Sequence, residues 1–346
     1  MEAGQRSTDS HTVGEQPSSA VAWTAWHHQL HQRLLRQPAL LPDGARLLLA
    51  ISGGQDSMTL LKLLQDLRQQ HQWRLRLWHG DHGWHPGSAH IASELQRWCA
   101  SQDLELTIEQ APAELERTEA AARRWRYEAL ERQALRISAD VVTGHTASDR
   151  AETLLLQMAR GTDLAGLASL RPLRRLSPDG PWLRRPLLGF SRGDTARICR
   201  DLALPIWEDP SNQSAAFARN RIRSEVFPVL EELHPDCSRR MAAQAERLSE
   251  VRDTQLELGA LVLEQLQADD GLDRRRLGQL SRSTRRHLLA QWLQTQGVPT
   301  IHAALLEQLS NRLAAGAPAG SSHLPEGWQL HWQGNSLRLQ PPAARH

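Results

Sequence analysis

The feature that most constrains the fold is a glycine turn between an apolar run and an amphipathic stretch. Residues 46–51 read RLLLAI, a short continuous apolar run of the kind found in buried parallel strands. The segment SGGQDS, residues 52–57, follows directly, and leucines then recur at helical spacing as far as residue 67. Two glycines permit a tight turn, and the N-terminus of a helix offers free N–H groups to an anion. The segment therefore predicts a phosphate-binding turn between a buried strand and a helix.

Strand and helix candidates continue to alternate beyond this turn. They cover residues 75–78, 88–101, 104–108, 114–136, 140–143 and 147–160. This alternation predicts an α/β fold in which a parallel sheet is wrapped by helices on both faces. Turns at residues 53–54, 81–83 and 144–145 each follow a strand candidate. Because ligands of such sheets bind at the carboxyl ends of the strands, we expect the three turns to share one active site.

The length of 346 residues and the later sequence predict a second, smaller unit. We expect a disordered polar lead at 1–22, a catalytic domain at 23–235, a helical connector at 236–268 and a small domain at 269–346. The small domain is expected to be mainly helical. It should contain a loop at 316–323 and a terminal hairpin of residues 328–332 and 336–339.

Composition disfavours several classes of protein. No apolar stretch approaches the roughly 20 residues of a membrane span, so we expect a cytoplasmic protein that does not enter a membrane. Cys99, Cys199 and Cys237 form no CxxC pair, which argues against a disulfide scaffold, a zinc knuckle or a sulfur-relay enzyme. The net charge of +2 does not by itself indicate a nucleic-acid partner. Arginine pairs such as residues 184–185 suit phosphate binding, with a solvated surface as the alternative for any single pair.

Asp56 is unusual in a simple anion cradle, because its carboxylate repels phosphate unless it binds a metal ion or caps the helix. A carboxylate beside a phosphate cradle suggests Mg²⁺ bridging to a triphosphate. The turn does not follow the GxxxxGK(S/T) pattern of Walker loops. An ordinary strand–turn–helix with a capping Asp or Ser remains the alternative.

The segment SGGQDS resembles the PP-loop of the adenine-nucleotide alpha-hydrolase-like ATP pyrophosphatases. Enzymes of this superfamily cleave ATP between the α- and β-phosphates, adenylate an oxygen of the substrate and release pyrophosphate. The resemblance implies ATP as a substrate and Mg²⁺ held by Asp56. It implies that ATP is bound by Ser52, Gly53, Gly54, Gln55, Asp56 and Ser57. The loop alone does not choose among the synthetases and tRNA thiolases of the superfamily.

Further blocks resemble the tRNA(Ile)-lysidine synthetases in their order and spacing. They are WHGDHGW at 78–84, EAAARRWRY at 119–127, GHTASDRAET at 144–153, WEDPSN at 207–212 and RNRIR at 219–223. The C-terminal part resembles the small tRNA-contacting domain of this family. Two departures stand in the third block, where the family usually has aspartate at Ser148 and glutamine at Arg150.

The resemblance implies ligation of L-lysine to C2 of the wobble cytidine in tRNA(Ile) with a CAU anticodon. The expected intermediate is an adenylated tRNA, and the expected products are lysidine, AMP and diphosphate. The implied catalytic residues are Asp56, His145, Asp149 and Arg219. The implied lysine-binding residues are Asp149 and Glu152, and the implied tRNA-binding residues are Arg123, Arg126, Arg221 and Arg223.

The spacing of Asp149 and Glu152 supports their part of this expectation. Three residues apart on a helix, the two carboxylates share a face, where they can hold ammonium groups and accept a proton from an attacking amine. A solvated surface pair is the alternative.

The residues disfavour three other functions. A tRNA 2-thiolation enzyme, the nearest alternative, would need cysteines near the loop, and an amide ligase of the superfamily usually carries an amidotransferase domain. A tRNA-binding module with a decayed site is disfavoured because Asp56, Asp149 and Glu152 are intact. The oligomeric state is left open, with a homodimer among the expectations.

Overall fold

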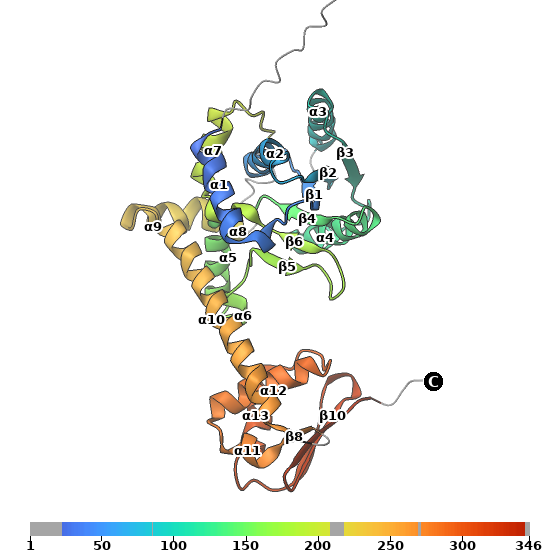
Figure 1. The fold of residues 1–346 in the computed structure, drawn as a ribbon, viewed down its shortest axis with the longest axis vertical. Helices are drawn as coiled ribbons and strands as arrows, with labels where there is room; N and C mark the ends of the chain where they lie inside the picture. The colour runs from blue at the N-terminus through green and yellow to red at the C-terminus, as the bar shows by residue number, and fades with distance from the viewer. Residues whose placement is uncertain (1–22, 85, 208–217, 269–270, 343–346) are drawn as a thin grey trace, which may run out of the picture. The chain divides into compact units, whose positions relative to one another are not determined.

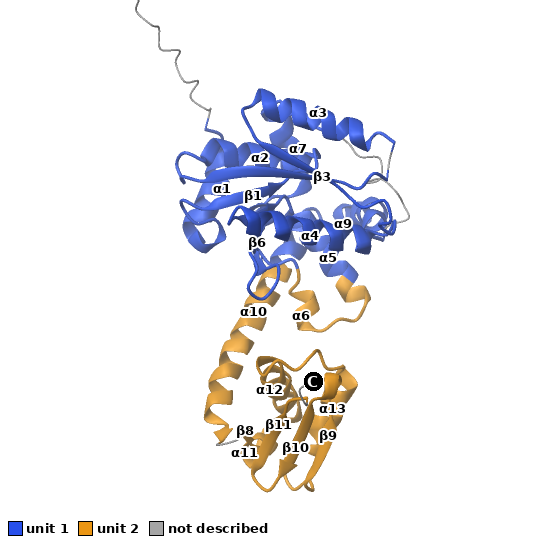
Figure 2. Cartoon of the chain, turned by 90° about the vertical axis from the view of Figure 1, so that its right-hand side faces the viewer, with its two compact units in different colours: residues 1–156, 170–243 blue, residues 157–169, 244–346 orange. Residues whose placement is uncertain are grey.

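The chain divides into two units, which Figure 2 colours separately. The first contains residues 1–156 and 170–243, and the second contains residues 157–169 and 244–346. The computed structural model describes residues 23–84, 86–207, 218–268 and 271–342. The predicted lead at 1–22 and residues 208–212 of the WEDPSN block lie outside the described residues, and the predicted domain boundaries stay a prediction.

A six-stranded sheet in the order β3-β2-β1-β4-β6-β5 forms the centre of the first unit (Figure 1). Its strands are β1 (Arg46–Ala50), β2 (Arg74–Asp81), β3 (Leu106–Gln110), β4 (Asp140–Thr143), β5 (Leu173–Arg175) and β6 (Trp182–Arg184). All neighbours pair in parallel except β5, which runs antiparallel to β6. The predicted α/β fold with a parallel sheet is therefore confirmed.

Helices cover both faces of this sheet because β1 is buried on both sides. Successive side chains of a strand point to opposite faces, so Leu47 and Leu49 enter one core and Leu48 enters another. The first core includes residues of α1 (Ala25–Arg36), α2 (Gln55–Leu67), α3 (Ser88–Ser101) and α7 (Arg192–Asp201). The second core is built on α4 (Glu119–Arg136).

The remaining helices of the first unit lie within or just after the predicted active-site blocks at 144–153 and 219–223. They are α5 (Ala147–Ala159), α8 (Ala218–Arg221), a π-helical turn (Ile222–Val226) and α9 (Phe227–Leu233). Helix α4 begins at Glu119 rather than near residue 114, because the Thr118 hydroxyl accepts the Ala121 N–H (3.2 Å) and caps the helix there. Strands β5 and β6 were not predicted, because three-residue strands leave too short a pattern in the sequence.

The second unit combines helices with an antiparallel sheet in the order β7-β8-β11-β10-β9. Its helices are α6 (Leu164–Leu167), α11 (Arg274–Gln279), α12 (Arg282–Thr295) and α13 (Ala303–Arg312), and α10 (Cys237–Gln265) reaches into it from the first unit. Its strands are β7 (Gln267–Ala268), β8 (Gly271–Asp273), β9 (Gly320–His323), β10 (Gln329–Gln333) and β11 (Ser336–Gln340).

The predicted terminal hairpin is confirmed as β10 and β11, which pair antiparallel. The loop predicted at 316–323 is wrong for residues 320–323, which form the edge strand β9. That strand reads GSSH and is largely exposed, so it lacks the apolar alternation by which strands are recognised.

Short 3₁₀ turns complete the description at Pro38–Leu40, Pro186–Gly189 and Pro325–Gly327. Among the described residues, no helix combines the length and the apolar character that crossing a membrane requires.

Candidate active site

The SGGQDS segment forms the predicted turn between β1 and α2. Gly53 has a φ of +84°, in the left-handed region that glycine tolerates best, and Gly54 is the residue before the first turn of α2. The Ser57 hydroxyl accepts the Ser52 N–H (3.2 Å) and donates to the Gly54 carbonyl (2.8 Å). Ser57 thus fixes the shape of the turn, and the first N–H groups of α2 have no partner within the helix.

The turn after β4 packs directly against this loop at Gly144. A Cβ atom built on Gly144 would lie 2.9 Å from the Asp56 carbonyl oxygen and 3.2 Å from the Ser57 nitrogen. Only a residue without a side chain permits this approach. Gly144 therefore brings α5, which begins at Ala147, beside the SGGQDS turn.

We expect Gly144→Ala to lower kcat/KM for ATP by about 10- to 100-fold, because the added Cβ forces Asp56 and the loop backbone to shift. Steady-state kinetics of pyrophosphate release would measure the effect. Gly193→Ala is the matched control, since its Cβ would meet Ser191 Oγ at an ordinary 3.6 Å. Equal activity of both variants would mean that the close approach at Gly144 is not needed for ATP turnover.

Asp56 lies in a polar network supplied largely by α7. Its carboxylate accepts hydrogen bonds from the Thr195 hydroxyl, from Arg192 Nη1 (3.3 Å) and from Gln55 Nε2 (3.4 Å). Burial raises the pKa of Asp56, and the nearby charge of Asp149 raises it further, while Thr195 and Arg192 act in the opposite direction. A second carboxylate that disfavours the charge of Asp56 makes this a site that a cation would stabilise.

The carboxylates predicted to bind lysine are already paired with arginines. Glu152 is 1% exposed, and its two oxygens accept from Arg223 Nε (2.7 Å) and Nη2 (2.9 Å). Arg219 Nε lies 3.2 Å from the same carboxylate, and Arg223 Nη2 lies 3.6 Å from Asp149. Burial raises the pKa of Glu152 while the hydrogen bonds from Arg223 lower it, so this carboxylate depends on its arginines to stay charged. The structure thus joins four predicted site residues in one network.

The π-helical turn at Ile222–Val226 carries Arg223 into this network. π-helical turns are rare and frequently occur at functional sites. The pattern of RNRIR did not predict this geometry. Arg221, two residues before Arg223, instead forms an exposed ion pair with Glu225 (2.8 Å) and is not part of the network.

A cluster of arginines surrounds Tyr127 on α4. The guanidinium carbons of Arg123, Arg126 and Arg174 lie 5.0, 5.6 and 5.2 Å from the centre of its ring. Burial alone would raise the pKa of Tyr127, but the charges of Arg123, Arg185 and Arg126 lower it to about 8. The structure therefore brings the predicted Arg123 and Arg126 together and adds Arg185 to them.

His145 is held neutral beside the same cluster. Burial lowers the pKa of His145 well below its ordinary value, and the charges of Arg185, Arg126, Arg123 and Arg219 lower it further. Its Nδ1 lies 2.8 Å from the Thr143 hydroxyl. A neutral imidazole among guanidinium groups suits hydrogen bonding to a phosphate or a base rather than charge pairing.

Comparison with known proteins identifies the family to which these elements belong. Residues 26–230 match the family model described as a PP-loop domain, and residues 272–338 match the TilS substrate binding domain. The tRNA(Ile)-lysidine synthase of Parasynechococcus marenigrum is 63% identical over 337 residues, which cover 96% of this chain and 100% of that protein. The chain belongs to the tRNA(Ile)-lysidine synthase family. A member from Prochlorococcus marinus is 42% identical and covers 92% of this chain and 96% of its own length.

The U34-tRNA thiolase NcsA of Methanococcus maripaludis shares the fold of the PP-loop domain. It matches with a TM-score of 0.55 at 18% identity, covering 65% of this chain and 79% of the thiolase chain. The cysteines here do not support thiolation, since Cys99, Cys199 and Cys237 are all buried and free. Burial raises the pKa of Cys99 to about 11 and also raises that of Cys199, so both favour the unreactive thiol.

The two departures from the lysidine synthase pattern have structural roles. The Ser148 hydroxyl accepts the backbone N–H of Arg192 (3.0 Å) and so ties α5 to α7. Arg150 is 1% exposed, and its Nε donates to the Leu170 carbonyl (3.3 Å). Leu170 has a φ of +57°, so Arg150 supports a strained turn.

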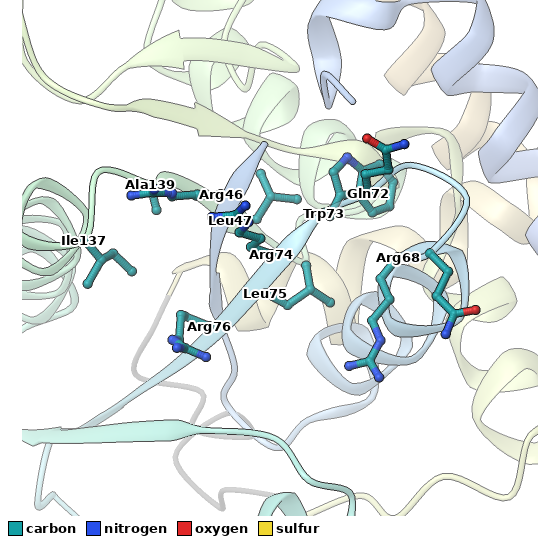
Figure 3. A pocket seen from close by; sticks show the side chains of 11 residues that line it. Arg46, Leu47, Arg68, Gln72, Trp73, Arg74, Leu75, Arg76, Ile137 and Ala139 are labelled. Carbon is teal, nitrogen blue, oxygen red and sulfur yellow. The ribbon is translucent and has the colours of Figure 1, made fainter. Parts of the chain in front are cut away.

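A pocket of about 740 Å³ lies at the opposite edge of the sheet, where β1 and β2 begin (Figure 3). Four arginines line it, namely Arg46, Arg68, Arg74 and Arg76. Arg68 follows the C-terminal end of α2, where the helix dipole favours a cation. None of residues 52–57 lines this pocket, so it is separate from the PP-loop turn of the lysidine synthase fold.

Sequence reasoning missed Arg192, Thr195 and Tyr127 as members of the site. Arg192 and Thr195 lie 136 and 139 residues from Asp56, to which they bond. A contact over such a separation leaves no local pattern in a single sequence. For Arg185 the sequence contained one indication of a role in the site, namely its place in an arginine pair suited to phosphate binding.

Proposed function

We propose that the chain ligates L-lysine to C2 of the wobble cytidine of tRNA(Ile) with a CAU anticodon, using ATP. The observation that carries this proposal is the packing of Gly144 on Asp56, which puts the acidic face of α5 beside a PP-loop turn. In this proposal, an ATP site and a site for an ammonium group share one edge of the sheet. Membership of the tRNA(Ile)-lysidine synthase family supports the same conclusion.

The PP-loop domain implies ATP binding at the turn of residues 52–57. The N–H groups of the first turn of α2 and the Ser52 and Ser57 hydroxyls would hold phosphate oxygens. Asp56 and Asp149 fit a magnesium ion, because they are oxygen ligands and the charge of Asp149 reaches Asp56 strongly enough to raise its pKa. When bound, this ion would neutralise charge on the phosphates.

In the first step, the C2 oxygen of the cytidine attacks the α-phosphorus of ATP. An oxygen–phosphorus bond forms, the bond between the α- and β-phosphates breaks, and diphosphate leaves. Arg123, Arg126 and Arg185 of the cluster around Tyr127, together with Arg219, stabilise the charge that develops on the α-phosphate. His145, neutral beside it, donates or accepts a hydrogen bond without adding charge.

In the second step, the amine of lysine attacks C2 and the carbon–oxygen bond to AMP breaks. Asp149 and Glu152 hold lysine through its ammonium groups, and one of them accepts the proton that the amine loses. Arg219 and Arg223 pair with Glu152 until lysine arrives. The wobble base must leave its stack to reach the site, which costs less in a single-stranded loop than in a duplex.

The family's substrate binding domain, residues 272–338, would contact the rest of the tRNA. Arg221 is exposed, so it suits a phosphate of the tRNA backbone. Lysine binding, Mg²⁺ binding, a homodimer and a cytoplasmic location stay predictions.

ATP labelled at its α-phosphorus tests the proposed order of steps. Without lysine, the label should enter tRNA(Ile) with a CAU anticodon, and added lysine should then release it as AMP. A tRNA with a changed wobble base should take up no label. Label that never enters the tRNA, or that lysine cannot release, would contradict the mechanism.

A further inference from the structure

Arg192 is held by two hydrogen bonds at its backbone and by one long contact at its side chain. Its N–H donates to the Ser148 hydroxyl (3.0 Å), and its carbonyl accepts from Gln55 Nε2 (2.9 Å). The side chain is 43% exposed and reaches Asp56 through one contact of 3.3 Å. The α7 backbone thus presents this guanidinium to the PP-loop turn without holding it tightly.

The PP-loop turn itself carries no cation. Residues 52–57 contain no lysine or arginine, whereas Walker loops supply a lysine to the β- and γ-phosphates. Asp56 adds a negative charge where the triphosphate would bind, and like charges at such distances repel strongly outside bulk water. A cationic side chain from elsewhere in the fold would therefore complement the metal ion at the terminal phosphates.

The other arginines near this turn are more tightly engaged. Arg223 makes two hydrogen bonds to the buried Glu152, and Arg239 contacts both oxygens of Asp194 at 2.6 Å. Freeing either would take hydrogen bonds away from a buried carboxylate, which is costly. Arg192 has a partially exposed partner and one long contact, so its release costs least.

We propose that Arg192 binds the β- and γ-phosphates of ATP, after pairing with Asp56 in the nucleotide-free protein. The exchange keeps the charge of Asp56 compensated in both states, first by Arg192 and then by the cation that accompanies ATP. Thr195 is a positioning residue, since its hydroxyl donates to Asp56 and holds that carboxylate in place while Arg192 moves. The planar guanidinium can contact two phosphate oxygens at once. This inference rests on the ATP chemistry of the proposed function.

Binding of nucleotides to the full chain, measured by calorimetry with Mg²⁺, tests the role of Arg192 apart from turnover. The ligands are a non-hydrolysable ATP analogue, diphosphate and AMP, and the variants are Arg192→Gln and Arg192→Lys. Arg192→Gln should weaken binding of the analogue and of diphosphate by about 10- to 100-fold, as expected for the loss of a charged hydrogen bond. The affinity for AMP should change by less than about 2-fold. Arg192→Lys should bind the analogue with an affinity between those of the wild type and Arg192→Gln. Arg200→Gln, an exposed arginine later on the same helix, is the matched control.

Unchanged binding of the analogue and diphosphate to Arg192→Gln would overturn the inference. An equal weakening of AMP binding would also overturn it, because Arg192 would then shape the whole site rather than bind the terminal phosphates. These outcomes are independent of the proposed function. If the wild-type chain transfers lysine but Arg192→Gln binds the analogue normally, the inference about Arg192 fails and the proposed function stands. If ATP binding depends on Arg192 but the wild-type chain transfers no lysine, the proposed lysine reaction fails and the inference about Arg192 stands.

Discussion

Replacing Asp56 with asparagine should lower ATP-dependent diphosphate release by about 10²- to 10³-fold, the loss typical of a preorganised electrostatic group. The amide keeps the size of the side chain and can still accept the hydrogen bond from Thr195. It removes the negative charge that compensates Arg192 in the empty site and would hold a cation with ATP. Diphosphate release in the presence of tRNA measures the effect. Activity within a few fold of wild type would remove Asp56 from the mechanism.

The same variant should be more stable than wild type at neutral pH. Burial and Asp149 raise the pKa of Asp56 above its ordinary 3.8, so the folded protein binds this proton more tightly than the unfolded chain. The free energy of unfolding of the wild type therefore falls as pH rises from 3.8 through the folded-state pKa of Asp56. Asparagine does not titrate, so the variant does not undergo this decrease. Thermal unfolding should give a higher Tm for Asp56→Asn at pH 7 and a smaller difference at low pH. A lower Tm at pH 7 would mean that the charge of Asp56 stabilises the fold.

Replacing Glu152 with glutamine should raise KM for lysine by about 100-fold, because a charge-assisted hydrogen bond is lost. The KM for ATP should change by no more than about 3-fold, since Glu152 contacts Arg219 and Arg223 rather than the PP-loop turn. Initial rates at varied lysine and fixed ATP, and the reverse, separate the two constants.

Glu225→Gln is the matched control for Glu152. Glu225 also pairs with an arginine of the RNRIR block, Arg221, but both side chains are exposed. An exposed ion pair contributes little to stability, so this variant should behave as wild type. If Glu152→Gln raised both KM values together and lowered Tm, Glu152 would serve to hold the arginines rather than to bind lysine.

Local patterns in the sequence predicted the strand, turn and helix that build the ATP site. The apolar run at 46–51 became β1, and the helix predicted at 88–101 coincides with α3. The strand predicted at 140–143 coincides with β4. These elements were predictable because each one depends on neighbours in the chain, through periodicity, glycine turns and helix starts.

The partners of the site residues could not be predicted in the same way. An Asp and a Glu three residues apart look like a solvated helix face, yet Glu152 is 1% exposed and bonds to Arg223, which lies 71 residues away. Thr195 reaches Asp56 only because α7 packs on α2. Burial and long-range pairing arise from tertiary packing, which a single sequence does not encode as a local pattern.

The most direct test of the proposed function is transfer of radiolabelled lysine to tRNA(Ile) with a CAU anticodon, in the presence of ATP and Mg²⁺. We expect acid-stable label in the tRNA that requires ATP and disappears when the wobble cytidine is changed. Absence of lysine incorporation, with tRNA-dependent diphosphate release driven by another nucleophile, would contradict the lysine reaction while keeping the ATP chemistry.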